Sequence, residues 1–217
     1  MINIITGHYG SGKTEFALNL ALKKRAEGKK VIICDLDIVN PYFRTSDVRK
    51  FLEDKGIRVI ASAFASSNVD IPTLPEDVLS VFADDETEAI LDVGGDDDGA
   101  VALGGYFNYI TKKEFNMFFV INTLRPMTSK VIDILELARN IEITSRLKIT
   151  HIINNTNLAY LTEEKHILES FETVEECAEK MNVPIKYILG KEEFLKNLPE
   201  RYKDKAFKIE TYMNLPF

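Results

Sequence analysis

The sequence predicts an α/β protein with a doubly wound, mostly parallel sheet of about seven strands and helices on both faces. Two observations support this prediction. Short apolar runs, mostly of β-branched and aromatic residues, recur along the chain, and amphipathic stretches of helical length separate them. In addition, Gly28 and Gly56 stand directly after two of these stretches, where helices commonly end. Such strand–helix repeats join parallel strands by right-handed crossovers.

The apolar runs are expected to be buried strands, because helices cover both faces of a parallel sheet. They are residues 2–6, 31–35, 57–60, 89–93, 117–122, 149–154 and 185–189. The helices are expected at residues 14–27, 45–55, 74–83, 100–112, 129–143 and 162–181. Residues 203–217 are expected to form a peripheral helix or tail. Residues 61–75 are long for a simple connection, and they either help form a substrate or partner surface or are a plain surface loop.

Length and composition favour a single domain that spans residues 1–217. A chain of 217 residues suits one α/β domain and leaves little room for a second. The formal net charge of −7 argues against non-specific DNA binding and against a polybasic membrane anchor. Cys34 and Cys177 lie in unrelated contexts, so a metal site built from a local cysteine pair is not expected. The low number of cysteines and the lack of a signal-peptide pattern predict a cytoplasmic location.

The first predicted strand leads into Gly7-x-x-x-x-Gly12-Lys13-Thr14, which is the spacing of a phosphate-binding loop in nucleoside triphosphatases. Glycines allow successive backbone N–H groups to turn toward phosphate oxygens, and the N-terminus of the next helix favours the same anion. Lys13 is expected at the β- and γ-phosphates, and Thr14 at Mg²⁺. The nucleotide-binding residues expected here are Gly7, His8, Tyr9, Gly10, Ser11, Gly12, Lys13, Thr14 and Glu15.

Two carboxylates, Asp35 and Asp37, stand at the end of the second predicted strand. Ligands of open α/β sheets bind beyond the carboxyl ends of the strands. An unpaired buried charge is costly, so two carboxylates at this point are expected to serve a Mg²⁺–triphosphate unit. One of them is expected to hold the metal through water and the other to position an attacking water. The alternative is a solvated strand end.

Asp92 ends the fourth predicted strand and is followed by Gly94 and Gly95. An aspartate at the tip of an apolar strand is the usual second half of a phosphate-loop site, where it binds Mg²⁺ directly or through water. Gly95 is expected to bring its backbone N–H close to the γ-phosphate, a contact that hydrolysis would break. Residues 96–98 are three further aspartates, and they form either a solvated acidic turn or part of a switch that senses the metal or substrate.

Polar residues also follow the fifth and sixth predicted strands. Arg125 is either a ligand for a phosphate or substrate carboxylate or an ordinary surface arginine. Asn154 and Asn155 are expected to contact the base through their amide groups. GTP-binding proteins generally carry Asn-Lys-x-Asp at this point, and its aspartate accepts hydrogen bonds from guanine. Asn157 stands in place of that aspartate, so the sequence favours adenine.

The segments GHYGSGKT, VIICDLD, AILDVGG and IINNTN, in this order, resemble the MinD/ParA-like branch of phosphate-loop ATPases. The resemblance extends over nearly the whole chain, from Met1 to about Leu189. It implies ATP or ADP and Mg²⁺ as ligands and an ATP-sandwiched homodimer that parts after hydrolysis. It also implies that Asp37 orients the hydrolytic water, that Asp92 is the Walker B aspartate, and that Gly95 lies in the second switch.

One residue departs from the pattern of that branch. His8 stands where the branch has a signature lysine that reaches across the dimer. Either Arg44 or Arg125 replaces that lysine, or activation across the dimer is weak. The resulting catalytic set is Lys13, Asp37 and Asp92, and the metal set is Thr14, Asp35, Asp37 and Asp92. The leading function is a slow Mg²⁺-dependent ATPase that acts as a switch on a protein partner. The alternatives are an ATP-dependent ligase acting on a small carboxylate, similar to dethiobiotin or cobyrinate synthases, and an ATP-sensing adaptor with little turnover.

Overall fold

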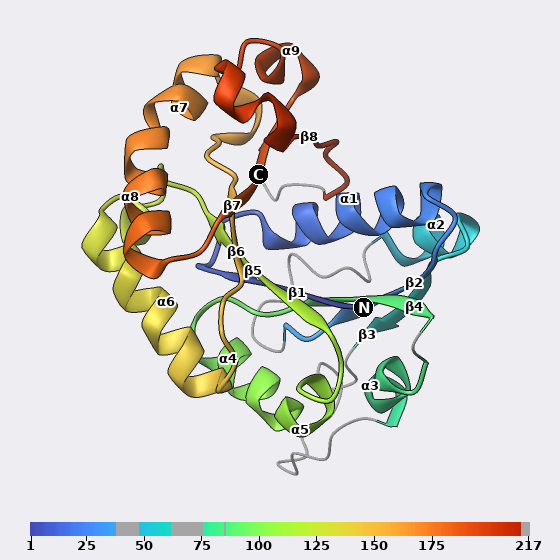
Figure 1. Ribbon diagram of the computed structural model, residues 1–217. Coiled ribbons are helices and arrows are strands. Elements are labelled where there is room, and N and C mark those ends of the chain that lie inside the picture. Colours follow the sequence, from blue (N-terminus) through green and yellow to red (C-terminus); the bar gives the residue numbers. More distant parts are fainter. Residues whose placement is uncertain (38–47, 62–75, 85, 214–217) are drawn as a thin grey trace.

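A computed structural model describes residues 1–37, 48–61, 76–84 and 86–213 (Figure 1). These residues form an eight-stranded sheet in the order β3-β2-β4-β1-β5-β6-β7-β8, and the paired strands are parallel. The strands are β1 (Ile2–Gly7), β2 (Lys30–Asp35), β3 (Arg58–Ala61), β4 (Thr87–Asp92), β5 (Phe115–Ile121), β6 (His151–Asn154), β7 (Ile185–Gly190) and β8 (Ala206–Lys208). The strand order places β1 between β4 and β5, so the residues that follow these three strands lie close together.

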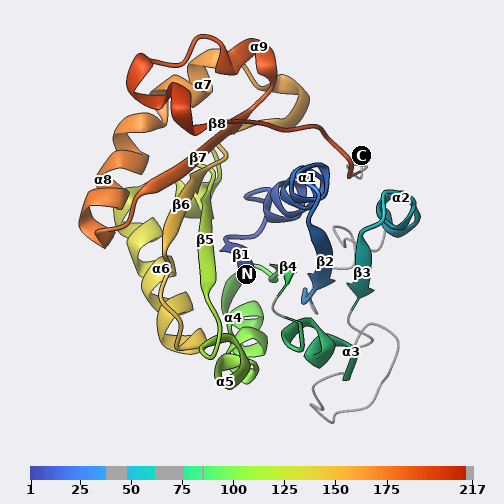
Figure 2. The ribbon, with the colours of Figure 1, turned by 45° about the vertical axis from the view of Figure 1, so that its right-hand side comes forward.

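Helices cover both faces of the sheet, which confirms the doubly wound α/β prediction (Figure 2). They are α1 (Lys13–Ala26), α2 (Arg49–Asp54), α3 (Glu76–Leu79), α4 (Asp96–Gly105), α5 (Phe107–Ile110), α6 (Val131–Ser145), α7 (Glu164–Glu169), α8 (Phe171–Met181) and α9 (Glu192–Leu195). Helices α1 and α2 pack on one face, and α3, α4, α5, α6 and α8 pack on the other. None of the helices in the described residues combines the length and apolar composition needed to cross a membrane.

Alternation along the strands divides the buried side chains into two cores. In β1, Ile4 joins the core under α4, α6 and α8, whereas Ile5 joins the core under α1. In β4, Leu91 and Ile90 divide in the same way. Successive side chains of a strand point to opposite faces, so apolar residues are needed at every position when both faces are covered. This is why the strands appear in the sequence as continuous apolar runs.

Two predicted helices are each divided in the structure. The helix expected at residues 100–112 is instead α4, which begins at Asp96, and α5, with Tyr106 between them. The helix expected at residues 162–181 is α7 and α8, divided at Ser170. Ser170 Oγ donates to the Ile167 carbonyl at 2.7 Å and accepts a hydrogen bond from Asn154 Nδ2 at 2.7 Å. The division at Ser170 therefore involves a tertiary contact with β6, which helical periodicity does not reveal.

The sheet has one strand more than predicted in the part of the chain that the structure describes. Within residues 203–217, expected to be a helix or tail, Ala206–Lys208 form β8 beside β7. Only Phe207 of these three residues is buried, and it packs edge-on to Phe16 of α1 at 5.5 Å between ring centroids. One inward side chain in a three-residue strand leaves too short an apolar pattern to recognise in the sequence.

The Gly28→Ala substitution is expected to lower the free energy of unfolding by about 1 kcal/mol. Gly28 follows α1 with a φ of +81°, and a Cβ there would meet nothing within 4 Å, so the expected effect comes from backbone conformation alone. Urea denaturation should measure it. Gly28→Asn is the matched control and should be closer to the wild type, because asparagine tolerates the left-handed conformation better than alanine. Equal stability of all three proteins would contradict this account.

Candidate nucleotide site

The loop between β1 and α1 has, at several positions, a backbone conformation that residues other than glycine rarely adopt. Gly7, Gly10 and Gly12 have φ values of +144°, +71° and +88°. A Cβ on Gly7 would collide with the Val120 carbonyl of β5, and a Cβ on Gly12 would collide with the Asn155 amide nitrogen. These glycines therefore allow the loop to turn tightly while it packs against the neighbouring strands.

Lys13 and Thr14 begin α1 directly behind this loop. Lys13 is 7% exposed, and its Nζ donates to the His8 carbonyl at 3.0 Å, so its ammonium group spans the loop. Thr14 Oγ1 donates to Asp92 Oδ2 at 2.7 Å across 78 residues of sequence. The structure therefore places the predicted metal-binding threonine next to the aspartate at the tip of β4, while the predicted phosphate-binding lysine contacts the loop.

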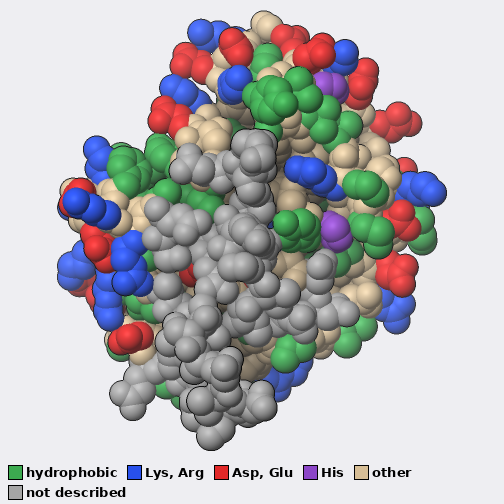
Figure 3. Space-filling model, turned by 180° about the vertical axis from the view of Figure 1, so that it is seen from behind, with side chains coloured by type: hydrophobic (Ala, Val, Ile, Leu, Met, Phe, Trp, Pro, Cys, Tyr) green, Lys and Arg blue, Asp and Glu red, His purple; other side chains and the backbone are tan. Residues whose placement is uncertain are grey.

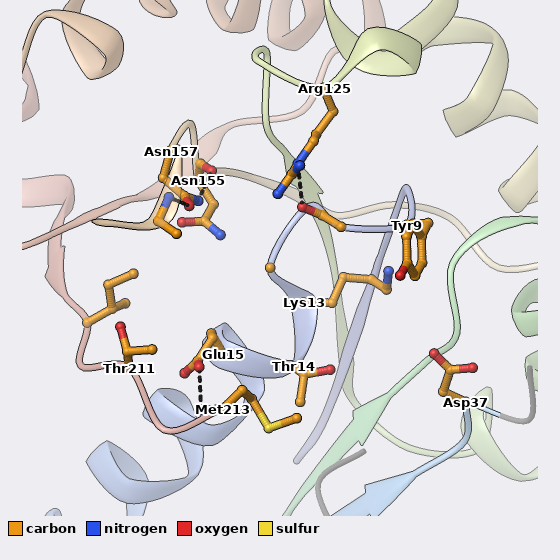
Figure 4. Close-up of a pocket in the computed structure, with 14 residues that line it drawn as sticks. Tyr9, Lys13, Thr14, Glu15, Asp37, Arg125, Asn155, Asn157, Thr211 and Met213 are labelled. Carbon is orange, nitrogen blue, oxygen red and sulfur yellow. Dashed lines mark hydrogen bonds between the residues drawn. The ribbon is translucent and has the colours of Figure 1, made fainter. Parts of the chain in front are cut away.

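The carboxylates at the ends of β2 and β4 lie side by side. Asp35 and Asp92 are partners in the parallel register and are almost completely buried. Burial raises the pKa of the adjacent Cys34 thiol, and the charges of Asp35 and Asp92 raise it further. Asp35 Oδ1 accepts a hydrogen bond from the Asp37 N–H at 2.9 Å, whereas the Asp37 side chain lines the pocket (Figure 4). Asp35 thus stabilises the turn that presents Asp37.

Two glycines after β4 lie against the loop and Asp37. A Cβ on Gly95 would lie 2.7 Å from the Tyr9 backbone nitrogen and 3.2 Å from Lys13 Nζ. A Cβ on Gly94 would lie 3.0 Å from Asp37 Oδ1. This segment is therefore in contact with the predicted phosphate-binding residues, and side chains at either position would displace them. The side chains of residues 96–98 lie outside the described part of the structure, as do Arg44 and residues 62–75 of the long predicted connection.

Arg125 is connected to the loop by a direct hydrogen bond. Its Nε donates to the Gly10 carbonyl at 3.0 Å, and the guanidinium group lies over Gly10 at the rim of the pocket (Figure 4). The segment after β5 is linked in turn to the segment after β6, because Thr123 and Thr156 hydroxyls are 3.2 Å apart. Of the two candidates for the missing signature lysine, Arg125 is thus part of the described site.

The two asparagines after β6 have different surroundings. Asn154 is buried away from the pocket, where its Nδ2 bonds Ser170 and its Oδ1 accepts the Thr156 N–H at 3.1 Å. The structure therefore does not support Asn154 as a nucleotide contact. Asn155 lines the pocket, and its Nδ2 donates to the Ser11 carbonyl at 2.8 Å. Both residues carry the same amide group, and the sequence did not reveal which of them faces the loop.

The P-loop, Asp37, Arg125 and Asn155 line a pocket of about 910 Å³, part of which is open to solvent. It runs from Asp37 and Lys13 at one end to Asn155 and Asn157 at the other (Figure 4). A second pocket adjoins it and shares Asn155 and Asn157, and apolar residues such as Phe194 line it further along. Five lining residues were not identified from the sequence: Asn157, Ala159, Ile209, Thr211 and Met213. Three of them lie in the predicted tail, and no sequence motif marks them.

Glu15 was expected to contact the nucleotide, but its carboxylate has backbone partners. It lines the pocket, and its Oε1 accepts the N–H groups of Tyr212 at 3.1 Å and Met213 at 2.7 Å. Burial raises the pKa of Glu15, and the two hydrogen bonds partly oppose this shift. The contact joins the first turn of α1 to the C-terminal segment.

Solved structures share this architecture. Cell division protein FtsY from Thermotoga maritima has a TM-score of 0.59 and 20% identity over 89% of this chain and 63% of that chain. A nucleotide-binding protein from Archaeoglobus fulgidus in complex with ADP has a TM-score of 0.55 and 15% identity over 90% of this chain and 84% of that chain. The chain has the P-loop NTPase fold. The signal recognition particle receptor FtsY from Elizabethkingia anophelis in complex with GDP matches with a TM-score of 0.54 and 18% identity.

The P-loop fold covers most of this chain but only part of some neighbours. The match covers 86% of this chain and 56% of the Elizabethkingia FtsY chain. No protein-family model and no curated protein matches the sequence. The P-loop itself is the loop 7–14, and β1 and α1 flank it as in the sequence prediction.

Proposed function

We propose that this protein binds ATP with Mg²⁺ and hydrolyses it slowly as a switch that controls a partner, as in the MinD/ParA-like branch. One arrangement is the main support. The P-loop residues, with Lys13 and Thr14, line one pocket together with Asp37, and Thr14 is hydrogen-bonded to the buried Asp92. Phosphoryl transfer needs positioning and charge stabilisation more than covalent chemistry, and these residue types supply both.

The oxygen donors at the strand tips fit Mg²⁺. Thr14 and Asp92 would hold the ion, with Asp35 and Asp37 acting through water, and the ion would neutralise charge on the triphosphate. Among the described residues, no group of three or more His, Cys, Asp or Glu side chains forms a cage for a metal. Mg²⁺ sites of nucleotide enzymes commonly use one or two carboxylates together with phosphates and waters, so the donor set is suitable.

The base end of the pocket favours adenine. Asn155 Nδ2 donates to the Ser11 carbonyl, which fixes the amide orientation. Asn155 Oδ1 is buried and has no hydrogen-bond partner among the described residues. The exocyclic amino group of adenine would provide a donor, whereas guanine has an acceptor at the same position. No carboxylate lines the adjoining pocket among the described residues, so a guanine-reading acid is missing there as well.

Gly94 and Gly95 lie between the proposed phosphate-binding residues and helix α4. They contact Asp37, Tyr9 and Lys13, and α4 begins directly after them. We expect a γ-phosphate to be bound by the Gly95 N–H and by Lys13, and its loss to release this segment. Helix α4 would transmit this release to α6, because the two helices are closely packed at Gly104. A Cβ added to Gly104 would lie only 2.9 Å from the Thr144 carbonyl.

Exposed apolar side chains around the site offer a surface for a second copy of the chain. They occur on the P-loop and on the segments after β5 and β6, namely Tyr9, Leu124, Met127, Tyr160 and Leu161. Figure 3 shows a face of the protein on which hydrophobic side chains lie on either side of a histidine. Two nucleotide faces packed together would bury these side chains. Light scattering should then show a dimer with ATP and Mg²⁺ and a monomer with ADP.

Calorimetry with ATP, ADP and GTP, each with Mg²⁺, tests the central proposal. ATP should bind at least tenfold more tightly than GTP.

Analysis of the reaction products then distinguishes the switch from the ligase and the adaptor. ADP and phosphate formed without an organic acceptor support the switch, acceptor-dependent turnover supports a ligase, and tight binding without turnover supports an adaptor. If no purine triphosphate binds, the proposal is wrong.

Arg125→Ala is expected to lower ATP turnover about tenfold and to weaken ATP binding by less. Arg125 and Lys13 are the cationic side chains among the described residues that line the pocket, and Arg125 lies over the P-loop at Gly10. Arg125→Lys should restore little, since lysine cannot bond Gly10 and a phosphate with one planar group. Steady-state kinetics measure both effects, and Arg139→Ala on the exposed side of α6 is the control. If turnover is unchanged in Arg125→Ala, Arg125 does not stabilise the phosphates during hydrolysis, and another residue does so.

A further inference from the structure

The segment after β8 crosses α1 and is held there by polar side chains of that helix. We call residues 209–213 the C-terminal strap (Figure 2). Asn19 Nδ2 donates to the Glu210 carbonyl at 2.9 Å, and Asn19 Oδ1 accepts the Glu210 N–H at 2.9 Å. Glu15 accepts the N–H groups of Tyr212 and Met213. Two side chains one helical turn apart thus satisfy four backbone groups of the strap.

The same strap forms a wall of the nucleotide pocket. Ile209, Thr211 and Met213 line it, opposite Asn155 and Asn157 (Figure 4). Ile209 and Thr211 also line the adjoining pocket. The alternation is that of an extended chain, in which every second side chain faces the same way. The strap therefore faces the end of the site that lies away from Asp37 and Lys13.

The attachment of the strap is local, so it can respond to a ligand. β8 has three residues and lies at the edge of the sheet. Beyond it, the Ile209 N–H donates to the Gly190 carbonyl of β7 at 3.1 Å. The rest of the strap is held by Asn19, by Glu15, by burial of Met213 and by stacking of Tyr212 on Phe51 at 5.4 Å between centroids. Segments attached by so few contacts open more readily than the core. A ligand that contacts the strap would stabilise its closed position.

We propose that Glu15 and Asn19 are positioning residues that hold the C-terminal strap as the wall of the nucleoside end of the site. This inference rests on the proposed function and deepens it. The strap would bind the nucleoside part of the ligand, whereas the P-loop binds its phosphates. Glu15, which holds the strap, directly follows Thr14 in α1, so the strap is attached next to the threonine proposed to bind the metal. Nucleotide and strap would stabilise one another.

The experiment compares two ligands, Mg²⁺–ATP and Mg²⁺–tripolyphosphate, by calorimetry. Both have the phosphate chain, but only ATP has a nucleoside. Glu15→Ala should weaken ATP binding about tenfold and tripolyphosphate binding less than twofold. Asn19→Ala should behave in the same way. Glu15→Gln should recover most of the ATP affinity, because the amide oxygen still accepts a strap N–H. Glu27→Ala, at the exposed end of the same helix, should match the wild type for both ligands.

Hydrogen exchange provides a readout that does not depend on tripolyphosphate. ATP should slow exchange of the Tyr212 and Met213 amides in the wild type and slow it much less in Glu15→Ala. Circular dichroism should show that each variant is folded. The proposal would be overturned by any of three results. The Glu15→Ala protein loses affinity for ATP and tripolyphosphate equally, its affinities are unchanged, or ATP does not alter hydrogen exchange of the strap. If the wild type binds neither ligand, the proposed function itself fails, which is a distinguishable result.

Discussion

Lys13→Ala is expected to weaken ATP binding at least about 100-fold and to abolish turnover. The Lys13 ammonium is buried behind the P-loop, where water screens it little, and it spans the loop to the His8 carbonyl. A triphosphate in this loop would place several negative charges beside it. Removing the Lys13 cation leaves those charges with only backbone N–H groups, Arg125 and the metal as partners. Calorimetry and a phosphate-release assay measure the two effects.

Lys29→Ala is the control for this substitution, since Lys29 is exposed beyond the end of α1. It removes the same charge from the protein and should leave affinity and turnover unchanged. Thermal unfolding should show that Lys13→Ala is folded before its affinity is interpreted. A folded Lys13→Ala protein that binds ATP as tightly as the wild type would show that the P-loop is not the triphosphate site.

Asp37→Asn is expected to reduce turnover about 100-fold while ATP affinity changes by less than fivefold. Asp37 lies at the Lys13 end of the pocket, and its backbone N–H is fixed by Asp35. Asparagine keeps the shape of the side chain but loses the negative charge that orients and polarises an attacking water. The effect should therefore fall on kcat and leave KM almost unchanged.

Asp54→Asn is the matched control, because Asp54 is exposed at the end of α2 and lies outside the pocket lining. Single-turnover kinetics should show that the slow step in Asp37→Asn is chemistry. Equal losses of binding and turnover would instead make Asp37 a binding residue. Unchanged turnover would remove it from the proposed mechanism.

Features that depend on residues close together in the sequence were predicted correctly, whereas features that depend on tertiary packing were not. The P-loop was recognisable because its glycines, lysine and threonine lie within eight consecutive positions and their roles depend on local backbone geometry. The Thr14–Asp92 contact was also foreseeable, because strand tips of a parallel sheet meet at one edge. By contrast, Asn154 and Asn155 have the same chemistry, and only their packing against Ser170 and Ser11 separates them.

The sequence by itself determined the class of fold, the position of the phosphate loop and the carboxylates that accompany it. Apolar periodicity and short motifs are sufficient for these features, because each is encoded by neighbouring residues. Only the tertiary structure decided that the C-terminal strap completes the pocket, where contacts join residues 191 to 198 positions apart. Such contacts use backbone N–H and carbonyl groups of the strap, which every residue except proline carries, so no side-chain pattern marks them in advance.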